Sequence, residues 1–369
     1  MSKQQQQLTK SAATPLIQSH NIEALNGEKL LELFREEKDL HQYIPENFGE
    51  TDPRSNERVL FNPARASRPN ADSHTKKTST CPICDGKTTH IIDYSELSSG
   101  FTFTNKNLFP AIFPHPALKT KTQSKNSFPA WGLHLLQWTS SFHDRDWHNM
   151  EIEDLAIVMD RLAAIERHLL TEFSEISNDA GWEFNNQTGH VSIIKNGGLG
   201  SGGSLEHGHH QIVFSNVLPR RIIENMNFEQ AHGQVFSKFI LEENPESLVI
   251  QDFGEAVLLV PYFMRRPYNM LLVVKNTSKK YIHHLTPEER IAVCKGWVTA
   301  ISAIHRIMEQ NGLLISYNVI THNGPGAGLY FEFLPRSQTE GGFELIGLSV
   351  CQSSPEIAAQ QIRKTLKTK

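Results

Sequence analysis

The stretch that decides the fold covers residues 193–214 and reads IIKNGGLGSGGSLEHGHHQIVF. Three histidines fall within four positions, at His207, His209 and His210, after a glycine-rich run and before an apolar run. Glycines let backbone N–H groups approach a phosphate without interference from a Cβ. The apolar run predicts a strand, and alternation along it places His207, His209 and Gln211 on one face. The stretch therefore predicts phosphate chemistry at a histidine, acting as nucleophile or as general acid.

A cluster of three histidines has a simpler explanation. Such clusters also occur as surface patches or as metal-binding runs without catalysis. The glycine run immediately upstream favours phosphate chemistry over both.

The same stretch resembles the active-site segment of the galactose-1-phosphate uridylyltransferase family, a branch of the histidine-triad superfamily. The family pattern is Asn-x-Gly, a run of small residues, Ser, and then His-Pro-His-x-Gln. Here Gly208 stands where the family has proline, a change that loosens the backbone but removes no reactive group. The resemblance implies His209 as nucleophile and Gln211 as its amide partner in catalysis. It implies four substrate-binding positions in the loop: Asn196, Gly202, Gly203 and Ser204.

Two further segments resemble the substrate-binding parts of the family. Arg65 and Arg68 follow an apolar strand and precede Pro69, and guanidinium forks suit phosphate. The resemblance implies that both arginines face the nucleotide diphosphate. A second element, ending in Phe109-Pro110-Ala111, implies a nucleotide contact from Asn107, or from Asn105 if the register slips.

Cys81-Pro82-Ile83-Cys84 is either a redox pair or half of a zinc site. No second Cys-x-x-Cys exists, so histidines would have to complete a zinc tetrahedron. The resemblance implies a structural Zn²⁺ held by Cys81, Cys84, His143 and His207. Taken alone, His143 reads as an ordinary histidine at the end of a strand.

Composition narrows the class of protein. The chain has 369 residues, 38% hydrophobic and 21% charged, with a net charge of −4. These values predict a globular protein and give no sign of nucleic-acid binding. The apolar runs look too short for a bilayer, the N-terminus has no apolar core, and four cysteines make no disulfide framework. We therefore expect no membrane partner and a cytoplasmic location.

The order of elements predicts an α+β fold built from two similar halves. Strands, a helix over residues 151–175 and more strands precede residue 219, and a second such series contains a helix beginning after Thr286. This pattern indicates an internal duplication, with mainly antiparallel sheets in histidine-triad-like halves. We expect a disordered polar segment at 1–25, a first half at 26–219 and a second half at 220–369.

The second half departs from the family at one place. The family often has His-x-His there, binding a second metal, whereas this chain has Tyr330-Phe331-Glu332 and retains only His322 of that set. We therefore expect the second metal site to be absent or rebuilt.

The resemblance implies a function. A nucleoside monophosphate would move between a nucleoside diphosphate sugar and a sugar 1-phosphate through a covalent nucleotidyl-histidine. One alternative is a phosphorylase of the same superfamily acting on ADP-glucose or a dinucleoside polyphosphate. Another is a zinc-stabilised nucleotide-binding protein without catalysis. The family also implies a homodimer whose active sites borrow residues across the interface.

Overall fold

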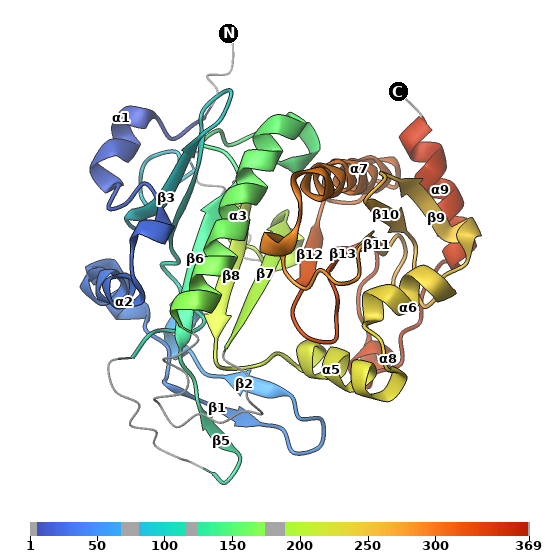
Figure 1. Cartoon of the computed structure of the whole chain (residues 1–369), viewed down its shortest axis with the longest axis horizontal. Helices are drawn as coiled ribbons and strands as arrows, with labels where there is room; N and C mark the ends of the chain where they lie inside the picture. Colours follow the sequence, from blue (N-terminus) through green and yellow to red (C-terminus); the bar gives the residue numbers. More distant parts are fainter. Residues whose placement is uncertain (1–5, 68–80, 116–123, 174–188, 368–369) are drawn as a thin grey trace.

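The computed structural model describes residues 6–67, 81–115, 124–173 and 189–367. Within them the main element is a ten-stranded sheet in which every neighbouring pair is antiparallel. The predicted α+β class is therefore confirmed (Figure 1). In spatial order the strands are β3 (Ile91–Glu96), β4 (Phe101–Lys106), β6 (Gly132–Trp138), β8 (His209–Ser215), β7 (His190–Gly197), β12 (Tyr317–His322), β13 (Tyr330–Pro335), β11 (Met270–Val274), β10 (Ala256–Leu259) and β9 (Val249–Asp252).

The two ends of this sheet repeat one strand order. Counted along the chain, β3-β4-β6-β8-β7 runs first, second, third, fifth, fourth, and β9-β10-β11-β13-β12 runs the same way. Each set has one long helix between its third and fourth strands, and the two sets meet where β7 pairs with β12. A common strand order is what two histidine-triad-like halves would show, but the duplication itself stays a prediction.

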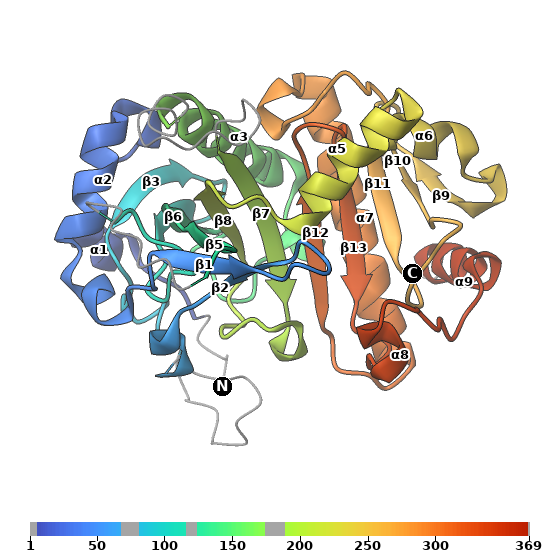
Figure 2. The same ribbon diagram turned by 90° about the horizontal axis from the view of Figure 1, so that it is seen from below.

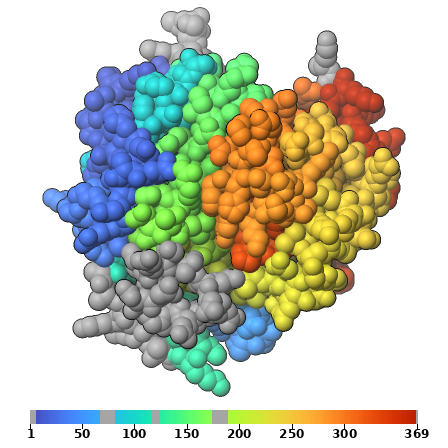
Figure 3. Space-filling view, viewed as in Figure 1, coloured from blue at the N-terminus to red at the C-terminus, as the bar shows by residue number. Residues whose placement is uncertain are grey.

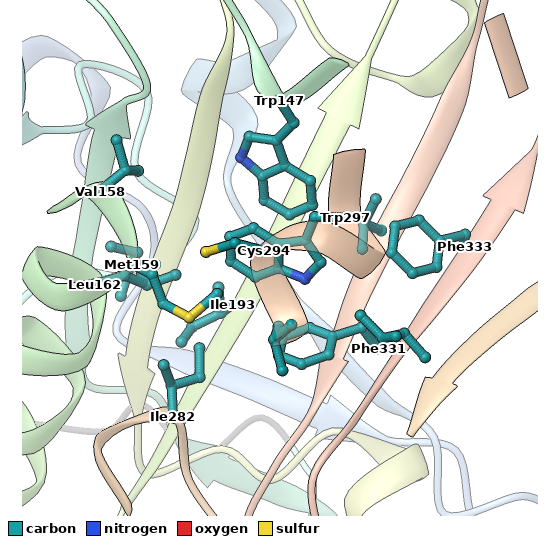
Figure 4. Packing of buried hydrophobic residues seen from close by; sticks show 14 of the residues in the cluster. Trp147, Val158, Met159, Leu162, Ile193, Ile282, Cys294, Trp297, Phe331 and Phe333 are labelled. Carbon is teal, nitrogen blue, oxygen red and sulfur yellow. The ribbon is translucent and has the colours of Figure 1, made fainter. Parts of the chain in front are cut away.

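Two long helices cover one face of the sheet, α3 (Ile152–Glu172) and α7 (Pro287–Gln310). Both predicted helices are thus present, and Thr286 and Glu289 form the predicted capping box. The core beneath them is centred on Trp147 and Trp297, whose rings stack 3.7 Å apart (Figure 4). This core joins both ends of the sheet into one apolar cluster.

Two apolar clusters of described residues cover the ends of the opposite face of the sheet. At the first end, α1 (Lys10–Ala13) and the Cys81 turn pack on Phe103 and Trp138. At the second end, α6 (Phe236–Glu243) packs on β10, β11 and Tyr330. The glycine-rich loop follows β7 and leads to His209 at the start of β8, near the middle of the sheet.

The N-terminal segment corrects one expectation. Residues 1–25 were expected to be disordered, but residues 6–25 are ordered, while residues 1–5 lie outside the described part. Leu8, Ala13 and Ile22 are almost completely buried. The backbone N–H of Leu8 donates to the carbonyl of Ser141 at 2.9 Å. These few apolar side chains fix an otherwise polar segment because each enters a core formed by residues distant in sequence.

A small second sheet and several shorter helices complete the described part (Figure 2). The small sheet has the order β2-β1-β5. The bounds are β1 (Phe48–Thr51), β2 (Arg58–Leu60), β5 (Ser127–Pro129), α2 (Gly27–Glu36), α5 (Arg220–His232), α8 (Gly342–Leu345) and α9 (Pro355–Lys367).

Helix α7 corrects the expectation that every apolar run is too short for a bilayer. By length and composition it is the one helix in the described residues that could cross a membrane. However, 61% of its apolar window is buried inside the molecule, as in the core helix of a globular protein. The space-filling view shows the orange surface near its N-terminal end lying directly against the green surface of α3 (Figure 3).

Candidate active site and metal centre

The glycine-rich loop connects β7 to β8 and is shaped by two glycines with positive φ. Gly198 has φ +75°, and a Cβ there would lie 1.9 Å from the carbonyl oxygen of Ile315. Gly202 has φ +82° and is exposed, and a Cβ there would meet no atom within 4 Å. Gly203 is buried and Ser204 is half-buried beside it. The loop therefore presents backbone where phosphate oxygens can approach.

Asn318 of β12 holds this loop in place, a role that the sequence analysis did not assign to it. Its side-chain amide donates to Asn196 Oδ1 at 2.6 Å and to the carbonyl of Ser201 at 2.9 Å. The second half of the chain thus orders the loop of the first half.

His209 is the first residue of β8 and is 5% exposed. Its Nδ1 lies 2.8 Å from the carbonyl oxygen of His207. Since a carbonyl can only accept, Nδ1 carries the proton and Nε2 keeps its lone pair. The ring packs against Trp138 with centroids 4.8 Å apart. This is the tautomer and the immobilisation that a histidine nucleophile requires.

The electrostatic surroundings keep this histidine neutral. Burial lowers the pKa of His209 to about 4, and nearby Lys195 adds to the effect. The His207 carbonyl and Asp146 oppose the shift without reversing it. The imidazole is therefore uncharged at neutral pH.

Gln211 and His210 point to opposite faces of β8, as predicted. Strand alternation puts Gln211 on the face of His209. His210 is buried on the helix-covered face, with its ring 5.0 Å from that of Trp147 and 5.9 Å from that of Trp297. His210 is thus a core residue.

The structure brings together the four residues that were expected to hold zinc. Their ligand atoms all lie within 4.8 Å of one another. His207 Nδ1 is 3.7 Å from Cys81 Sγ and 3.6 Å from Cys84 Sγ, and His143 Nδ1 is 3.9 Å from Cys84 Sγ. Zn–S and Zn–N bonds of about 2.3 and 2.0 Å in a tetrahedron give donor separations of about 3.6 Å. The group could therefore hold a metal ion, and the spacing suits zinc.

The chemistry of the donors also fits a cation. His207 Nε2 donates to the carbonyl of Ser140 at 2.7 Å, which leaves Nδ1 free to bind a metal. Burial disfavours the thiolate of Cys81, but His143 and His207 outweigh it and lower its pKa to about 5. Burial and the neighbouring Cys81 then raise the pKa of Cys84 to about 12. A cation between the two sulfurs would relieve this repulsion.

Comparisons with known proteins agree with this geometry. No family model matches the chain. It is 23% identical over 341 residues to an ADP-glucose phosphorylase of Arabidopsis thaliana, covering 85% of this chain and 91% of that protein. It is 26% identical over 349 residues to a galactose-1-phosphate uridylyltransferase of Cryptococcus neoformans, covering 84% and 87%. The predicted resemblance to the galactose-1-phosphate uridylyltransferase family is confirmed.

Solved structures show the same fold. A uridylyltransferase structure aligns with a TM-score of 0.69 at 19% identity, covering 87% of this chain and 98% of the other. The structure of an ADP-glucose phosphorylase from Arabidopsis thaliana with bound ADP-glucose aligns with a TM-score of 0.56 at 19% identity, covering 87% and 99%.

At the position of the family's second metal set, this chain has a contact between a histidine and a carboxylate. His322 Nε2 lies 2.9 Å from Glu332 Oε2, and the ring of Tyr330 stacks on His322 at 4.3 Å. In the described part of the chain, only the Cys81 cluster gathers three or more metal-ligating side chains. Glu332 therefore engages His322 Nε2 at this position, while His322 Nδ1 has no hydrogen-bond partner among the described residues.

The remaining predicted substrate contacts have mixed outcomes. Asn105 is buried and engaged internally, accepting from Trp138 Nε1 at 2.9 Å. Asn107 is half-buried beside His134 and is the better candidate of the two. Arg65 lies half-buried in a short 3₁₀ helix, Pro63–Ser67, and Arg68 lies outside the described residues. The positions of these residues neither support nor exclude their predicted contacts with a substrate.

A separate pocket of about 570 Å³ lies beside α5 and is lined by none of the predicted site residues. Its lining carries similar numbers of arginines and glutamates, including the ion pair of Arg266 with Glu340. Because these charges largely compensate one another, the pocket does not by itself indicate an anionic ligand.

Proposed function

We propose that the chain is a nucleotidyltransferase that moves a nucleoside monophosphate between a nucleoside diphosphate sugar and a sugar 1-phosphate. The observation that carries this proposal is His209: buried, neutral, with Nδ1 bound to a carbonyl and the Nε2 lone pair free. It lies at the end of a glycine loop whose geometry suits phosphate. The similarity to uridylyltransferases and to an ADP-glucose phosphorylase supports the same chemistry.

The reaction would proceed in two displacements at phosphorus. His209 Nε2 attacks the α-phosphorus, the bond from that phosphorus to the bridging oxygen breaks, and the sugar 1-phosphate leaves with the electron pair. The imidazole ring then carries positive charge, and its Nδ1–H donates to the His207 carbonyl, which stabilises that charge. An oxygen of the acceptor phosphate attacks the same phosphorus and releases Nε2. No proton is consumed overall.

Gln211 suits this chemistry because its amide cannot act as a general acid at neutral pH. The leaving group is a phosphate anion that needs no proton. An amide NH₂ can instead donate to the non-bridging oxygens. Asn107, Asn196, Gly202, Gly203, Ser204, Arg65 and Arg68 are the proposed positioning groups around the substrate.

The proposed Zn²⁺ has a structural role. Cys81, Cys84, His143 and His207 would hold it. It would cross-link the cysteine turn to the segment that carries His209. The attacking atom belongs to His209 and not to the metal. Experiments can therefore separate the effect of the metal on the folded segment from the nucleophilic attack by His209.

A phosphorylase is the second candidate. The similarity to an ADP-glucose phosphorylase covers 85% of the chain, as much as the similarity to the uridylyltransferase. Its first displacement would be the same, with an adenylyl instead of a uridylyl group on His209, and inorganic phosphate would be the acceptor. A dinucleoside polyphosphate phosphorylase would share the nucleotidyl-histidine. A non-catalytic nucleotide-binding protein would form no adduct.

Intact-protein mass spectrometry after incubation with UDP-glucose or ADP-glucose separates these functions. We expect an acid-labile uridylyl adduct that is absent from His209→Ala. An adenylyl adduct alone would move the substrate to the phosphorylase. If neither nucleotide forms an adduct, the proposed mechanism is wrong for both sugars and the binding-protein alternative gains support.

Three further predictions belong to this proposal. The sequence duplication would place a first half at 26–219 and a second at 220–369. Residues from a second copy would complete the active site in a homodimer. The chain would act in the cytoplasm.

A further inference from the structure

Gly208, which separates the metal-ligand candidate His207 from the nucleophile candidate His209, faces an occupied space. A Cβ at this position would lie 2.5 Å from Asp146 Cγ and less than 3 Å from both carboxylate oxygens. Such separations are far below van der Waals contact. Glycine is therefore needed here because a carboxylate packs against its Cα, and a loose backbone is not the reason.

The carboxylate of Asp146 is held on several sides. Asp146 is the N-cap of a short 3₁₀ helix, Trp147–Asn149, and its Oδ1 accepts from the backbone N–H of Trp147 at 2.8 Å. The same oxygen lies 2.7 Å from Lys195 Nζ. Because these partners fix the carboxylate, a new Cβ at residue 208 would have to move the backbone rather than the side chain.

Lys195 offsets the desolvation cost of this largely buried carboxylate. The lysine side chain is 1% exposed and that of Asp146 is 17% exposed. An isolated charge at either position would be strongly unfavourable, whereas the pair is mutually neutral. Lys195 belongs to β7 and is in register with His210 of β8, so the pair ties the 3₁₀ helix to the strand pair of the site.

The other side of the same three-residue segment is bound to the end of β6. The carbonyl of Gly208 accepts from Thr139 N–H at 3.0 Å. The His207 ring donates to Ser140, and the His209 ring donates to His207. A displacement of Gly208 would therefore move both histidines away from their partners.

We infer that Asp146, paired with Lys195 and admitted by the missing side chain of Gly208, is a positioning residue for His209. The inference rests on the proposed function, because the positioning is for attack on phosphorus. In this role neither Asp146 nor Lys195 needs to touch the substrate. Together they fix the position of the backbone at Gly208 and therefore of the His209 ring. Misplacement of a reacting group by about 1 Å costs about 10²-fold in rate.

The test is the effect of Gly208→Ala in two backgrounds, measured as the single-turnover rate of nucleotidyl-enzyme formation with UDP-glucose and with ADP-glucose. In the wild-type background we expect a loss of about 10²-fold. In Asp146→Ala/Lys195→Met the clash is gone, and we expect the added alanine to cost less than about 3-fold. Gly27→Ala is the matched control, because a Cβ there meets only ordinary contacts at 3.4 Å, and we expect no change.

Asp146→Asn provides a milder variant that keeps the side-chain volume. We expect it to slow nucleotidyl transfer about 10-fold with KM for the nucleotide sugar unchanged, since ground-state binding does not use Asp146. Zinc content and the midpoint of thermal unfolding are measured for every variant. Rate losses that simply follow zinc loss, or a change in KM alone, would overturn the positioning role.

Equal costs of Gly208→Ala in both backgrounds would also overturn the inference. A wild-type protein that forms no adduct would instead refute the proposed function. The coupling is then read from thermal unfolding: the alanine should lower the midpoint only where Asp146 and Lys195 are present. Equal shifts of the midpoint in both backgrounds would refute the packing argument independently.

Discussion

The two ends of the large sheet share a strand order but differ at the start of the equivalent strands. β8 begins with His209 and has Gln211 two residues on, whereas β13 begins with Tyr330 and has Glu332 two residues on. At the first end the histidine has a free Nε2. At the second end Glu332 is already bound to His322. One end therefore leaves a reactive atom available, whereas at the other end the carboxylate of Glu332 engages His322 Nε2.

This difference shows how one arrangement of strands can serve two purposes. The second end contributes support: Asn318 anchors the glycine loop, and Trp297 stacks on Trp147 beneath His210. The first end carries the proposed nucleophile, together with the four candidate metal ligands and the ordered N-terminal segment. Substitutions at each end of the sheet can test this difference between the two ends.

The largest expected effect is on catalysis. His209→Ala should reduce nucleotidyl transfer at least about 10⁴-fold because it removes the attacking atom. Tyr330→Phe, at the equivalent strand position, should stay within about 3-fold of the wild type. Steady-state rates with UDP-glucose and ADP-glucose, each with its acceptor, measure both variants. A fully active His209→Ala would refute the proposed nucleophile.

Loss of the metal should have the next largest effect. Cys84→Ser should reduce the bound zinc from about one ion per chain to almost none and lower the unfolding midpoint by about 10 °C. Cys351→Ser is the control, since Cys351 belongs to the second half and lies outside the ligand cluster. Elemental analysis and calorimetry give the two readouts. A metal-free preparation with unchanged stability and activity would refute the proposed metal centre.

Local patterns in the sequence predicted the elements that depend on near neighbours. The helix beginning after Thr286, the strand carrying His209 and Gln211, and the opposite direction of His210 all follow from periodicity and capping. The four candidate metal ligands were predicted from the resemblance to the family, and the structure places their ligand atoms close together.

The remaining features depend on contacts between residues distant in sequence. Asn318 reaches Asn196 across 122 positions, and nothing near Asn318 predicts that contact. Gly208 looked like a loosened proline position because Asp146 is 62 residues earlier in the printed sequence. Residues 6–25 looked disordered because composition does not reveal where three buried side chains will find a core.

The N-terminal segment offers a smaller test of the first end. Leu8 is 1% exposed and packs in the cluster that includes Cys81 and Trp138. Leu8→Ala should lower the free energy of unfolding by about 2–4 kcal/mol through the cavity it leaves. Leu314→Ala, at a side chain 89% exposed in the second half, should change it by less than about 0.5 kcal/mol. Urea denaturation compares them, and equal effects would mean that residues 6–25 do not contribute to the core in solution.

The smallest expected effect concerns the contact between Glu332 and His322 at the second end. Burial disfavours the charged form of Glu332, but His322, Arg221 and Arg265 outweigh it, so its pKa lies below the ordinary value. A depressed carboxyl pKa stabilises the fold above the unfolded-state pKa of about 4.3, and that contribution is lost as pH falls through the folded-state pKa. Glu332→Gln should therefore cost about 1–3 kcal/mol at pH 7 and progressively less in acid.

Urea denaturation from pH 7 down to about pH 2 follows this difference past the depressed pKa of Glu332, with Glu243→Gln at an exposed site as the control. The wild type and Glu332→Gln should converge at the acid end, while Glu243→Gln should match the wild type throughout. Nucleotidyl transfer at pH 7 should stay within about 3-fold in both variants, because the pair belongs to the supporting end of the sheet. A constant stability difference across this pH range would show that Glu332 acts through packing rather than charge, and loss of transfer would show that the two ends are not separable in function.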